Sequence, residues 1–295
     1  MSHAALPGRD PRGLPGYRWL ANGQSTLAGP LLDLYRRLDR LFLSWAEEWG
    51  ATEYLFPTFL PARELACVDY LRSFPHLATF PVTLDPDDEN LLAFTRGEAP
   101  DAEGRVRLTA TTPVVDVLTP AACYHFYATF RGEHLDKPRY VTTRATCFRR
   151  ETHYEPLARQ WSFSMREIVC LGTSDEVKAF LEDGRRRVAR YVEEIGLGVA
   201  WEMATDPFFR PQQSPKHLAQ RLDPVKTEMV FGGSLAIGSV NFHRNYFGEA
   251  FEIRREGRDA FSGCLAFGVE RWLRAFLACF GPEPAGWPAL PPGQV

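Results

Sequence analysis

Two neighbouring stretches of this chain carry side chains suited to binding an anion and a flat ring. The run FRRE contains Arg149 and Glu151, and Phe163 and Glu167 follow on the next strand-like run. Side chains two positions apart on a strand share a face. A guanidinium group can neutralise a phosphate, and an aromatic ring can stack on a base. The set suits a nucleotide, although an exposed Arg149–Glu151 ion pair beside a core Phe163 would explain the same residues.

A third stretch, SGCLAFGVERWLRAF near the C-terminal end, strengthens the nucleotide interpretation. Gly263 and Gly268 allow another backbone or a ligand to approach closely. Arg271 lies in the first turn of the helix predicted for residues 269–280, where the N-terminal dipole already favours anions. These residues therefore add a second cation to the candidate site.

The elements that must position these residues can be predicted from periodicity. Apolar residues recur at helical spacing from Leu27 to Trp49, and Gly50 follows as a helix end. The run ATEYLFPTFLP then predicts an edge strand interrupted by Pro57, and acidic residues 85–105 predict a surface loop or ragged hairpin.

Alternation predicts an antiparallel hairpin of Tyr140–Glu151 with Gln160–Leu171, which would carry the FRRE run. TSDE at 173–176 predicts a capping box that starts a helix to about Ile195. Further strands are expected over 225–231 and 234–242, with AFEIRRE as a weaker candidate. Antiparallel strands with helices at the start, middle and end indicate an α+β fold.

Bulk properties bound the class of protein. The chain has 295 residues, 45% hydrophobic content and a formal net charge of -3, which argues against a dominant nucleic-acid surface. No apolar run approaches the roughly 20 residues needed to cross a membrane, so we expect a cytoplasmic protein. Residues 1–26 are rich in Gly and Pro and predict an irregular lead-in, and residues 27–295 predict a single domain. The six cysteines are scattered, which predicts reduced thiols rather than disulfides.

In order and separation, Pro57, FRRE and GVER resemble the three signature motifs of class II aminoacyl-tRNA synthetases. The resemblance covers the chain from about residue 27, and it is closest to catalytic domains of seryl-tRNA synthetases. It implies an antiparallel sheet flanked by helices, and a homodimer formed through the first-motif helix and strand.

The resemblance also implies roles in binding ATP with Mg2+. Arg149 would contact the α-phosphate, and Glu151 would bind the adenine amino group. Phe163 and Arg271 would sandwich the adenine, with Arg271 also near the γ-phosphate. Asn241 matches the end of a metal-binding run whose acidic residue is absent from SLAIGSVNF here, so the resemblance assigns no Mg2+ ligands.

Cys123 replaces a carboxylate that binds the substrate amine in ordinary seryl enzymes, and a neutral thiol cannot hold an ammonium group. The resemblance to zinc-dependent seryl-type enzymes implies instead a Zn2+ site formed by Cys123, Glu167 and Cys264, with one position open for a free amine. Glu228 would lie near that amine. The remaining cysteines are expected to be small buried apolar residues, namely Cys67, Cys147, Cys170 and Cys279.

The acceptor is implied by what precedes the first motif. A tRNA-binding arm of two long helices needs on the order of 80 residues, whereas 26 Gly/Pro-rich residues precede the helix here. The chain therefore resembles amino acid:[carrier protein] ligases, which make an aminoacyl-adenylate and transfer the aminoacyl group to a phosphopantetheine thiol. The resemblance implies a small amino acid, glycine or alanine, and an acidic carrier protein that meets Lys216, His217 and Arg221. A solvated helix explains these three residues equally well.

Two other functions fit the same residues. One is a minimal aminoacyl-tRNA synthetase, or a biosynthetic adenylate-forming enzyme with another acceptor. The other is a non-catalytic relative that senses an amino acid or nucleotide. Such a sensor would not need the complete set of Arg149, Glu151, Phe163 and Arg271, which favours the enzyme.

Overall fold

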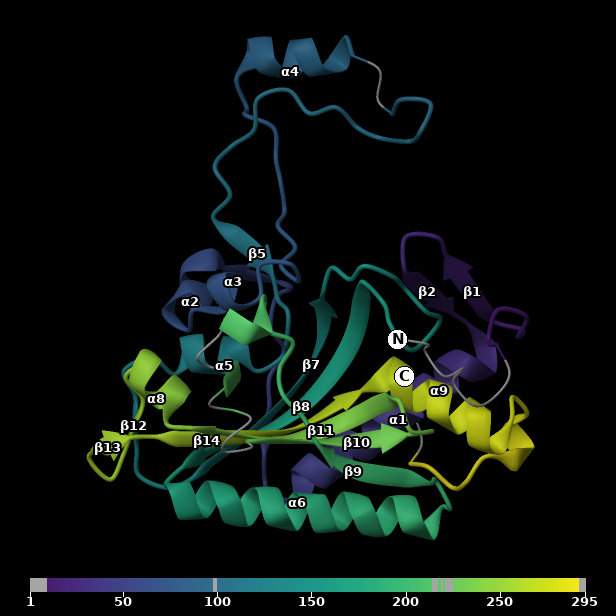
Figure 1. Cartoon of the computed structure of the whole chain (residues 1–295), viewed down its shortest axis with the longest axis vertical. Coiled ribbons are helices and arrows are strands. Elements are labelled where there is room, and N and C mark those ends of the chain that lie inside the picture. The colour runs from purple at the N-terminus through teal and green to yellow at the C-terminus, as the bar shows by residue number, and fades with distance from the viewer. Residues whose placement is uncertain (1–9, 98–99, 214–216, 219, 221–224, 292–295) are drawn as a thin grey trace.

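The centre of the molecule is a seven-stranded sheet (Figure 1). The computed structural model describes residues 10–97, 100–213, 217–218, 220 and 225–291. The sheet order is β3-β7-β8-β14-β11-β10-β9, and neighbours are antiparallel except for the parallel pair β3 and β7. The strands are β3 (Thr52–Glu53), β7 (Arg139–Phe148), β8 (Ser162–Gly172), β14 (Phe261–Gly268), β11 (Leu235–Arg244), β10 (Lys226–Phe231) and β9 (Val199–Met203).

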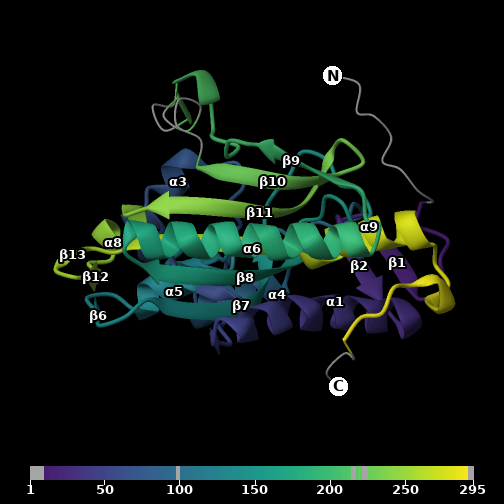
Figure 2. The same cartoon turned by 90° about the horizontal axis from the view of Figure 1, so that it is seen from below.

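Three long helices cover one face of this sheet (Figure 2). They are α1 (Gly29–Glu48), α6 (Ser174–Glu194) and α9 (Val269–Phe280). Their apolar stripes bury Phe42, Phe180 and Trp272 against sheet residues such as Ile168 and Phe267. This larger core determines which side chains of the strands face the helices.

Short elements cover the opposite face and leave room for a cavity. The helices there are α2 (Ala62–Cys67), α3 (Tyr70–Ser73), α5 (Tyr124–Thr129) and α8 (Tyr246–Ala250). The pleat of β8 sends Phe163, Met165 and Glu167 to this face, while Arg166 and Ile168 point to the helices. Strand alternation therefore decides which residues of the hairpin can meet a ligand.

The remaining elements are small. Two hairpin-like pairs are β1 (Tyr17–Leu20) with β2 (Gln24–Leu27) and β4 (Phe59–Pro61) with β5 (Asp116–Leu118). A three-stranded sheet contains β6 (His134–Leu135), β12 (Arg254–Arg255) and β13 (Arg258–Asp259). Helix α4 (Asp88–Thr95) and the 3-10 turns η1 (Pro211–Gln213) and η2 (Pro284–Gly286) complete the described elements.

The local signals in the sequence correctly predicted several element ends. Thr173 and Glu176 form the expected capping box of α6, in which the Thr173 side chain accepts from the Glu176 amide at 3.3 Å. Gly50 follows α1 with a φ of 63° and donates its amide to Glu47 O, so it ends that helix as predicted. The α+β fold with an antiparallel sheet and flanking helices is confirmed.

Four local predictions differ from the structure. The lead-in is not irregular throughout, because β1 and β2 pair over residues 17–27. The acidic segment 85–105 contains α4, whose amides at Glu89 and Asn90 are capped by the Asp87 side chain. AFEIRRE spans the end of α8 and the short β12 rather than forming one strand. Strand β14 was not predicted, because it is central, buried at every position but its two ends, and shows no alternation.

Candidate active site

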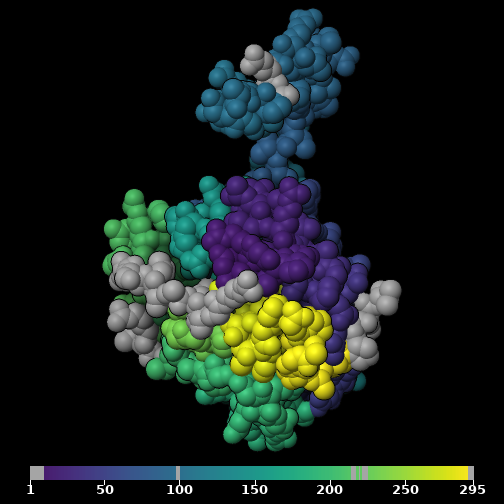
Figure 3. Space-filling model, turned by 90° about the vertical axis from the view of Figure 1, so that its right-hand side faces the viewer, coloured from purple at the N-terminus to yellow at the C-terminus, as the bar shows by residue number. Residues whose placement is uncertain are grey.

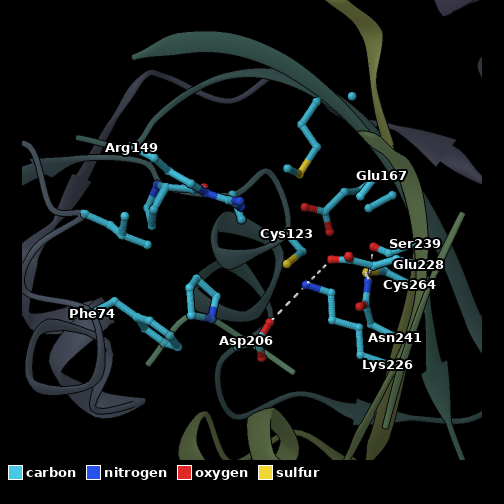
Figure 4. A pocket seen from close by; sticks show the side chains of 18 of the residues that line it. Phe74, Cys123, Arg149, Glu167, Asp206, Lys226, Glu228, Ser239, Asn241 and Cys264 are labelled. Carbon is cyan, nitrogen blue, oxygen red and sulfur yellow. Dashed lines mark hydrogen bonds and ion pairs between the residues drawn. The ribbon is translucent and has the colours of Figure 1, made fainter. Parts of the chain in front are cut away.

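A cavity of about 510 Å3 opens on the face of the sheet opposite the long helices (Figure 4). Residues from several strands and from the loops after β5 and β7 line it. The nine residues assigned from the sequence to ATP, metal or substrate all lie in its wall: Cys123, Arg149, Glu151, Phe163, Glu167, Glu228, Asn241, Cys264 and Arg271. The fold therefore gathers residues from across the chain into one place.

Arg149 lies one residue beyond β7, where the hairpin opens. Its amide donates to Trp161 O at 2.9 Å, which continues the strand pairing by one step. Its Nε donates to Pro120 O at 2.8 Å, and its guanidinium carbon lies 5.3 Å from the Phe163 ring centroid. These contacts hold the guanidinium against a ring at the cavity wall.

Glu151 lies in the loop after β7, beyond the end of the strand itself. Its Oε2 accepts from Arg159 Nη1 at 3.0 Å. Arg159 also lines the cavity, and sequence reasoning missed it because it belongs to the polar connection between β7 and β8. Only the return of that connection over the hairpin brings Arg159 to the site.

Arg271 lies in the first turn of α9 and is held by two backbone carbonyls. Its Nε donates to Ala158 O at 2.8 Å, and its Nη1 donates to Ala236 O at 2.9 Å. Burial, and then the positive charges of Arg149 and Arg159, lower the pKa of Arg271 to about 10. Three guanidinium groups around one cavity repel each other, so an anionic ligand would relieve the repulsion.

The other end of the cavity holds two thiols and a carboxyl group. Cys123 is the residue before α5, Glu167 belongs to β8 and Cys264 belongs to β14, and they approach one space in Figure 4. Glu167 Oε1 accepts from the Ala122 amide at 3.1 Å, whereas Oε2 is buried with no hydrogen-bond partner among the described residues. An unsatisfied buried carboxylate oxygen calls for an additional partner.

The pKa values of these three groups reflect their crowding. Contact with the Cys264 thiol, followed by burial, raises the pKa of Cys123 well above its ordinary value. Contact with Cys123 lowers the pKa of Cys264, but burial and the Glu167 carboxylate raise it more. Burial raises the pKa of Glu167. Negative charge on these three buried side chains is therefore unfavourable in free energy. A bound cation would make it favourable.

These side chains suit zinc in type, since thiolates and a carboxylate are zinc ligands and the orphaned Glu167 Oε2 faces the thiols. They do not form a finished metal cluster. Within the described part of the chain, no group of three or more His, Cys, Asp or Glu side chains is arranged to hold a metal ion. Zinc therefore remains a proposal that the residue types favour.

Two nitrogen atoms from β11 approach the sulfur of Cys264. Asn241 Nδ2 donates to it at 3.2 Å, and His243 Nε2 lies 3.6 Å away. His243 lines the cavity but was not predicted, because a single histidine at the end of a strand carries no recognisable pattern. The register of β11 against β14 shifts between Phe242 and Arg244, and Asn241 and His243 both reach the same sulfur.

Lys226 forms an ion-paired group in the wall near these residues (Figure 4). Its Nζ lies 3.2 Å from Asp206 Oδ1 and 3.0 Å from Glu228 Oε1. Asp206 Oδ2 also accepts from Gln220 Nε2 at 2.9 Å. Glu228 thus lies in the cavity as expected, but its charge is already paired with a lysine.

Predictions at other positions have mixed outcomes. Lys216 and Arg221 lie outside the described residues, and the half-buried ring of His217 packs edge-on to Phe208 at 6.1 Å. All six cysteines are free thiols, and Cys147 and Cys170 are buried as predicted. The prediction of burial is wrong for Cys67 and Cys279, which are exposed near helix ends.

Comparison with known proteins identifies relatives of this chain. Residues 116–280 match the family model of the tRNA synthetase class II core domain (G, H, P, S and T). "Amino acid--[acyl-carrier-protein] ligase 1" of Bradyrhizobium diazoefficiens is 33% identical over 265 residues, which cover 87% of this chain and 79% of that protein. A second ligase of that name and organism is 32% identical, over 79% of this chain and 71% of its own length.

More distant relatives are longer than this chain. The type-2 serine–tRNA ligase of Methanopyrus kandleri is 26% identical over 90% of this chain, which spans 55% of that enzyme. A crystal structure of M. kandleri SerRS with A. aeolicus tRNASec superposes with a TM-score of 0.78 at 21% identity. That match covers 98% of this chain and 60% of the other, and it shows the shared fold.

Proposed function

This chain belongs to the class II tRNA synthetase core family, as an amino acid:carrier-protein ligase, and from that premise we propose that it activates a small amino acid with ATP and transfers the aminoacyl group to a carrier-protein thiol. The observation that carries the proposal is the cavity itself. One end is lined by three guanidinium groups and an aromatic ring, and the other by two thiols and a carboxyl group. A nucleotide and an amino acid can occupy these two ends side by side.

The first reaction uses the basic end. A carboxylate oxygen of the amino acid attacks the α-phosphorus of ATP, and the bond to the departing pyrophosphate breaks. Negative charge develops on the phosphoryl oxygens, where Arg149 is fixed by Pro120 O and Phe163. Arg271 covers the other side of the nucleotide, and Glu151 binds the adenine amino group. Class II ligases of this type use ATP with Mg2+, for which we assign no ligands here.

The second reaction releases the nucleotide. The sulfur of a phosphopantetheine thiol attacks the carbonyl carbon of the aminoacyl-adenylate, the bond to the phosphate oxygen breaks, and AMP leaves. The product is an aminoacyl thioester on the carrier. The names of the relatives with 33% and 32% identity support this acceptor.

The sulfur-lined end would bind the amino group. Cys123, Glu167 and Cys264 would hold a zinc ion, and Asn241 would orient the Cys264 sulfur. Such an ion supplies an open coordination position for a free amine. Without a metal, two deprotonated thiols could not attract a neutral amine by charge alone.

The wall beside that end favours a small side chain. Lys226 and its partners Asp206 and Glu228 occupy the space next to Asn241 and Ser239 (Figure 4). A large apolar side chain on the substrate would separate Lys226 from Asp206 and Glu228 and leave their charges unpaired. Glycine or alanine therefore suits the cavity best.

The proposal assigns the whole reaction to one catalytic domain over residues 27–295. It also includes a homodimer, with the first-motif helix α1 and strand β3 near the second subunit. Among the described helices, none is both long and apolar enough to cross a bilayer.

The test is amino-acid-dependent exchange of pyrophosphate into ATP, measured for each common amino acid with and without a zinc chelator. We expect exchange with glycine or alanine, abolished by the chelator and restored by added zinc. Cys123→Ser should lose both zinc and exchange, while Cys170→Ser, at a buried cysteine in the core on the helical side of the sheet, should keep both. Zinc is counted by elemental analysis.

The acceptor is tested with labelled amino acid. We expect transfer to a phosphopantetheinylated acyl carrier protein and none to the same carrier without its phosphopantetheine arm. Neutral hydroxylamine should release the label, as it does from a thioester. Labelling of bulk tRNA instead would identify a minimal synthetase. Folded, zinc-loaded protein without exchange on any amino acid would point to a non-catalytic sensor.

A further inference from the structure

The N-terminal hairpin of β1 and β2, residues 17–27, lies against the connection between β7 and β8 (Figures 1 and 3). This connection, residues 149–161, carries Glu151, Ala158 and Arg159 to the basic end of the cavity. Among the described residues that line the cavity, none belongs to the hairpin. Any influence of the hairpin on a ligand must therefore pass through the connection.

Hydrogen bonds join the hairpin to the last two residues of the connection. The Trp161 amide donates to Gly23 O at 3.0 Å, while Trp161 O accepts from the Arg149 amide at 2.9 Å. The Ser25 hydroxyl donates to Gln160 Oε1. Gln160 is buried, so the loss of this donor would leave its amide oxygen without a hydrogen-bond partner. The hairpin thus satisfies both a backbone group and a buried side chain of the connection.

The turn of the hairpin also packs closely on the ring of Tyr154. Gly23 has a φ of 81°, and a Cβ atom added to it would lie 2.4 Å from Tyr154 Cγ. Rotation of the ring cannot move Cγ away, and the ring is held by stacking on Trp161 and by a 2.6 Å hydrogen bond from Arg150 Nη1 to its hydroxyl. Only glycine allows the hairpin to lie this close to the connection.

The same connection holds two residues assigned to ATP. Ala158 O accepts from Arg271 Nε at 2.8 Å, and Arg159 Nη1 donates to Glu151 Oε2 at 3.0 Å. The turn between them is internally bonded, since the amides of Ala158 and Arg159 donate to Glu155 O at 3.2 and 3.0 Å. A shift of the connection would therefore displace the partners of both the guanidinium and the carboxylate.

We propose that the β1–β2 hairpin is a positioning element for the basic end of the cavity, which it acts on by holding the β7–β8 connection in place through Gly23 and Ser25. Displacement of a binding group by about 1 Å can cost on the order of 100-fold in rate. The effect on ATP rests on the proposed function, whereas the ordering of the connection does not. The experiment therefore measures the two separately.

The ordering is measured by hydrogen exchange of residues 152–161 in protein without nucleotide, followed by mass spectrometry. Gly23→Ala should make these amides exchange about tenfold faster or more, because the added methyl group cannot fit against Tyr154. Gly257→Ala is the matched control. Gly257 forms the turn between β12 and β13 with a φ of 73°, and no described atom outside its chain neighbours lies within 4 Å of an added Cβ. It has the same backbone strain without the clash and should leave residues 152–161 unchanged.

The effect on ATP is measured by the kinetics of pyrophosphate exchange. Gly23→Ala should raise the KM for ATP by about tenfold or more, with a much smaller change in the KM for the amino acid. A general loss of stability would affect both substrates alike. Ser25→Ala is the milder variant, which removes only the hydrogen bond to Gln160, and it should raise the KM for ATP by a smaller factor. Circular dichroism confirms that each variant is folded.

A double variant tests the contact itself. In Gly23→Ala/Tyr154→Ala the ring that meets the added methyl group is gone, so the KM for ATP should be close to that of Tyr154→Ala alone. Equal hydrogen exchange in the wild type and Gly23→Ala, or an unchanged KM for ATP in that variant, would overturn the inference. Wild-type protein without pyrophosphate exchange would contradict the proposed reaction, while faster hydrogen exchange in Gly23→Ala would still support the role of the hairpin.

Discussion

The His243 imidazole lies 3.6 Å through Nε2 from the sulfur of Cys264, while its Nδ1 lies 3.0 Å from the Tyr127 hydroxyl and 3.1 Å from that of Ser262. Burial lowers the pKa of His243 to about 4, so the ring is neutral and carries one proton. If one of these hydroxyls donates to Nδ1, the ring proton is on Nε2 and points to the sulfur. Donation from both Asn241 and His243 would stabilise the thiolate form of Cys264 when a metal ion binds.

We therefore predict that His243→Leu weakens zinc or cobalt binding by about 10- to 100-fold, while His243→Gln, which keeps a donor, retains more of the affinity. Competition with a chromophoric chelator measures the affinity, and cobalt-to-thiolate absorption reports the sulfur directly. His125→Leu is the control, since His125 is buried against Phe56 outside the cavity. Equal affinity in all four proteins would show that His243 does not orient Cys264.

Arg149 and its neighbour Arg150 provide a second prediction. Arg149→Lys should lower the rate of pyrophosphate exchange by about 100-fold, because a lysine cannot reproduce the planar fork at the α-phosphate. Arg150 does not line the cavity, and its guanidinium packs against Tyr154 and Trp161. Arg150→Lys should change the rate by no more than about twofold. Similar losses in both variants would contradict the assigned role.

Lys226 should control both stability and amino-acid selection. Lys226→Met leaves Asp206 and Glu228 without their shared cation, which should lower the free energy of unfolding by about 1 to 3 kcal/mol. It should also raise the KM for the amino acid more than it lowers kcat. Adding Glu228→Gln to this variant should restore part of the stability. Urea unfolding and exchange kinetics measure the two effects, and an unchanged KM would exclude Lys226 from the substrate wall.

Glu270 should make stability depend on pH. Burial raises the pKa of this carboxyl from an ordinary value near 4.5 to about 7. Between these values the folded protein keeps a proton that the unfolded chain has lost, so this contribution is complete below about pH 4.5 and is lost as the pH rises through about 7.

Glu270→Gln keeps an acceptor for the Ser164 amide and removes the titration. The wild type should therefore lose stability relative to this variant, by on the order of 1 to 2 kcal/mol, between pH 5 and pH 8. Urea unfolding at several pH values measures the difference. Parallel curves for the two proteins would show that Glu270 does not titrate in this range.

Features set by neighbouring residues could be predicted from the sequence. The capping box at Thr173, the glycine that ends α1 and the pairing of β7 with β8 depend on interactions a few residues apart or on a simple alternation. The class II resemblance rests on FRRE and GVER, whose residue types are demanded by the phosphate and the adenine they would bind. These two patterns contain Arg149, Glu151 and Arg271, and the other six assigned residues of the cavity wall came from strand alternation and from the resemblance.

Other features depended on long-range packing. Arg159 and His243 reach the cavity only because a connecting loop folds back and because β11 pairs beside β14. Strand β14 lies in the middle of the sheet, so both of its faces are buried. That burial removes the alternation of polar and apolar residues by which a half-exposed strand is predicted. Helix α4 stands clear of the body (Figures 1 and 3), and although Asp87 caps it, none of its residues is buried, so no core contact reveals its place in the fold. Local chemistry thus specified which groups the chain carries, and burial between distant segments specified which of them meet.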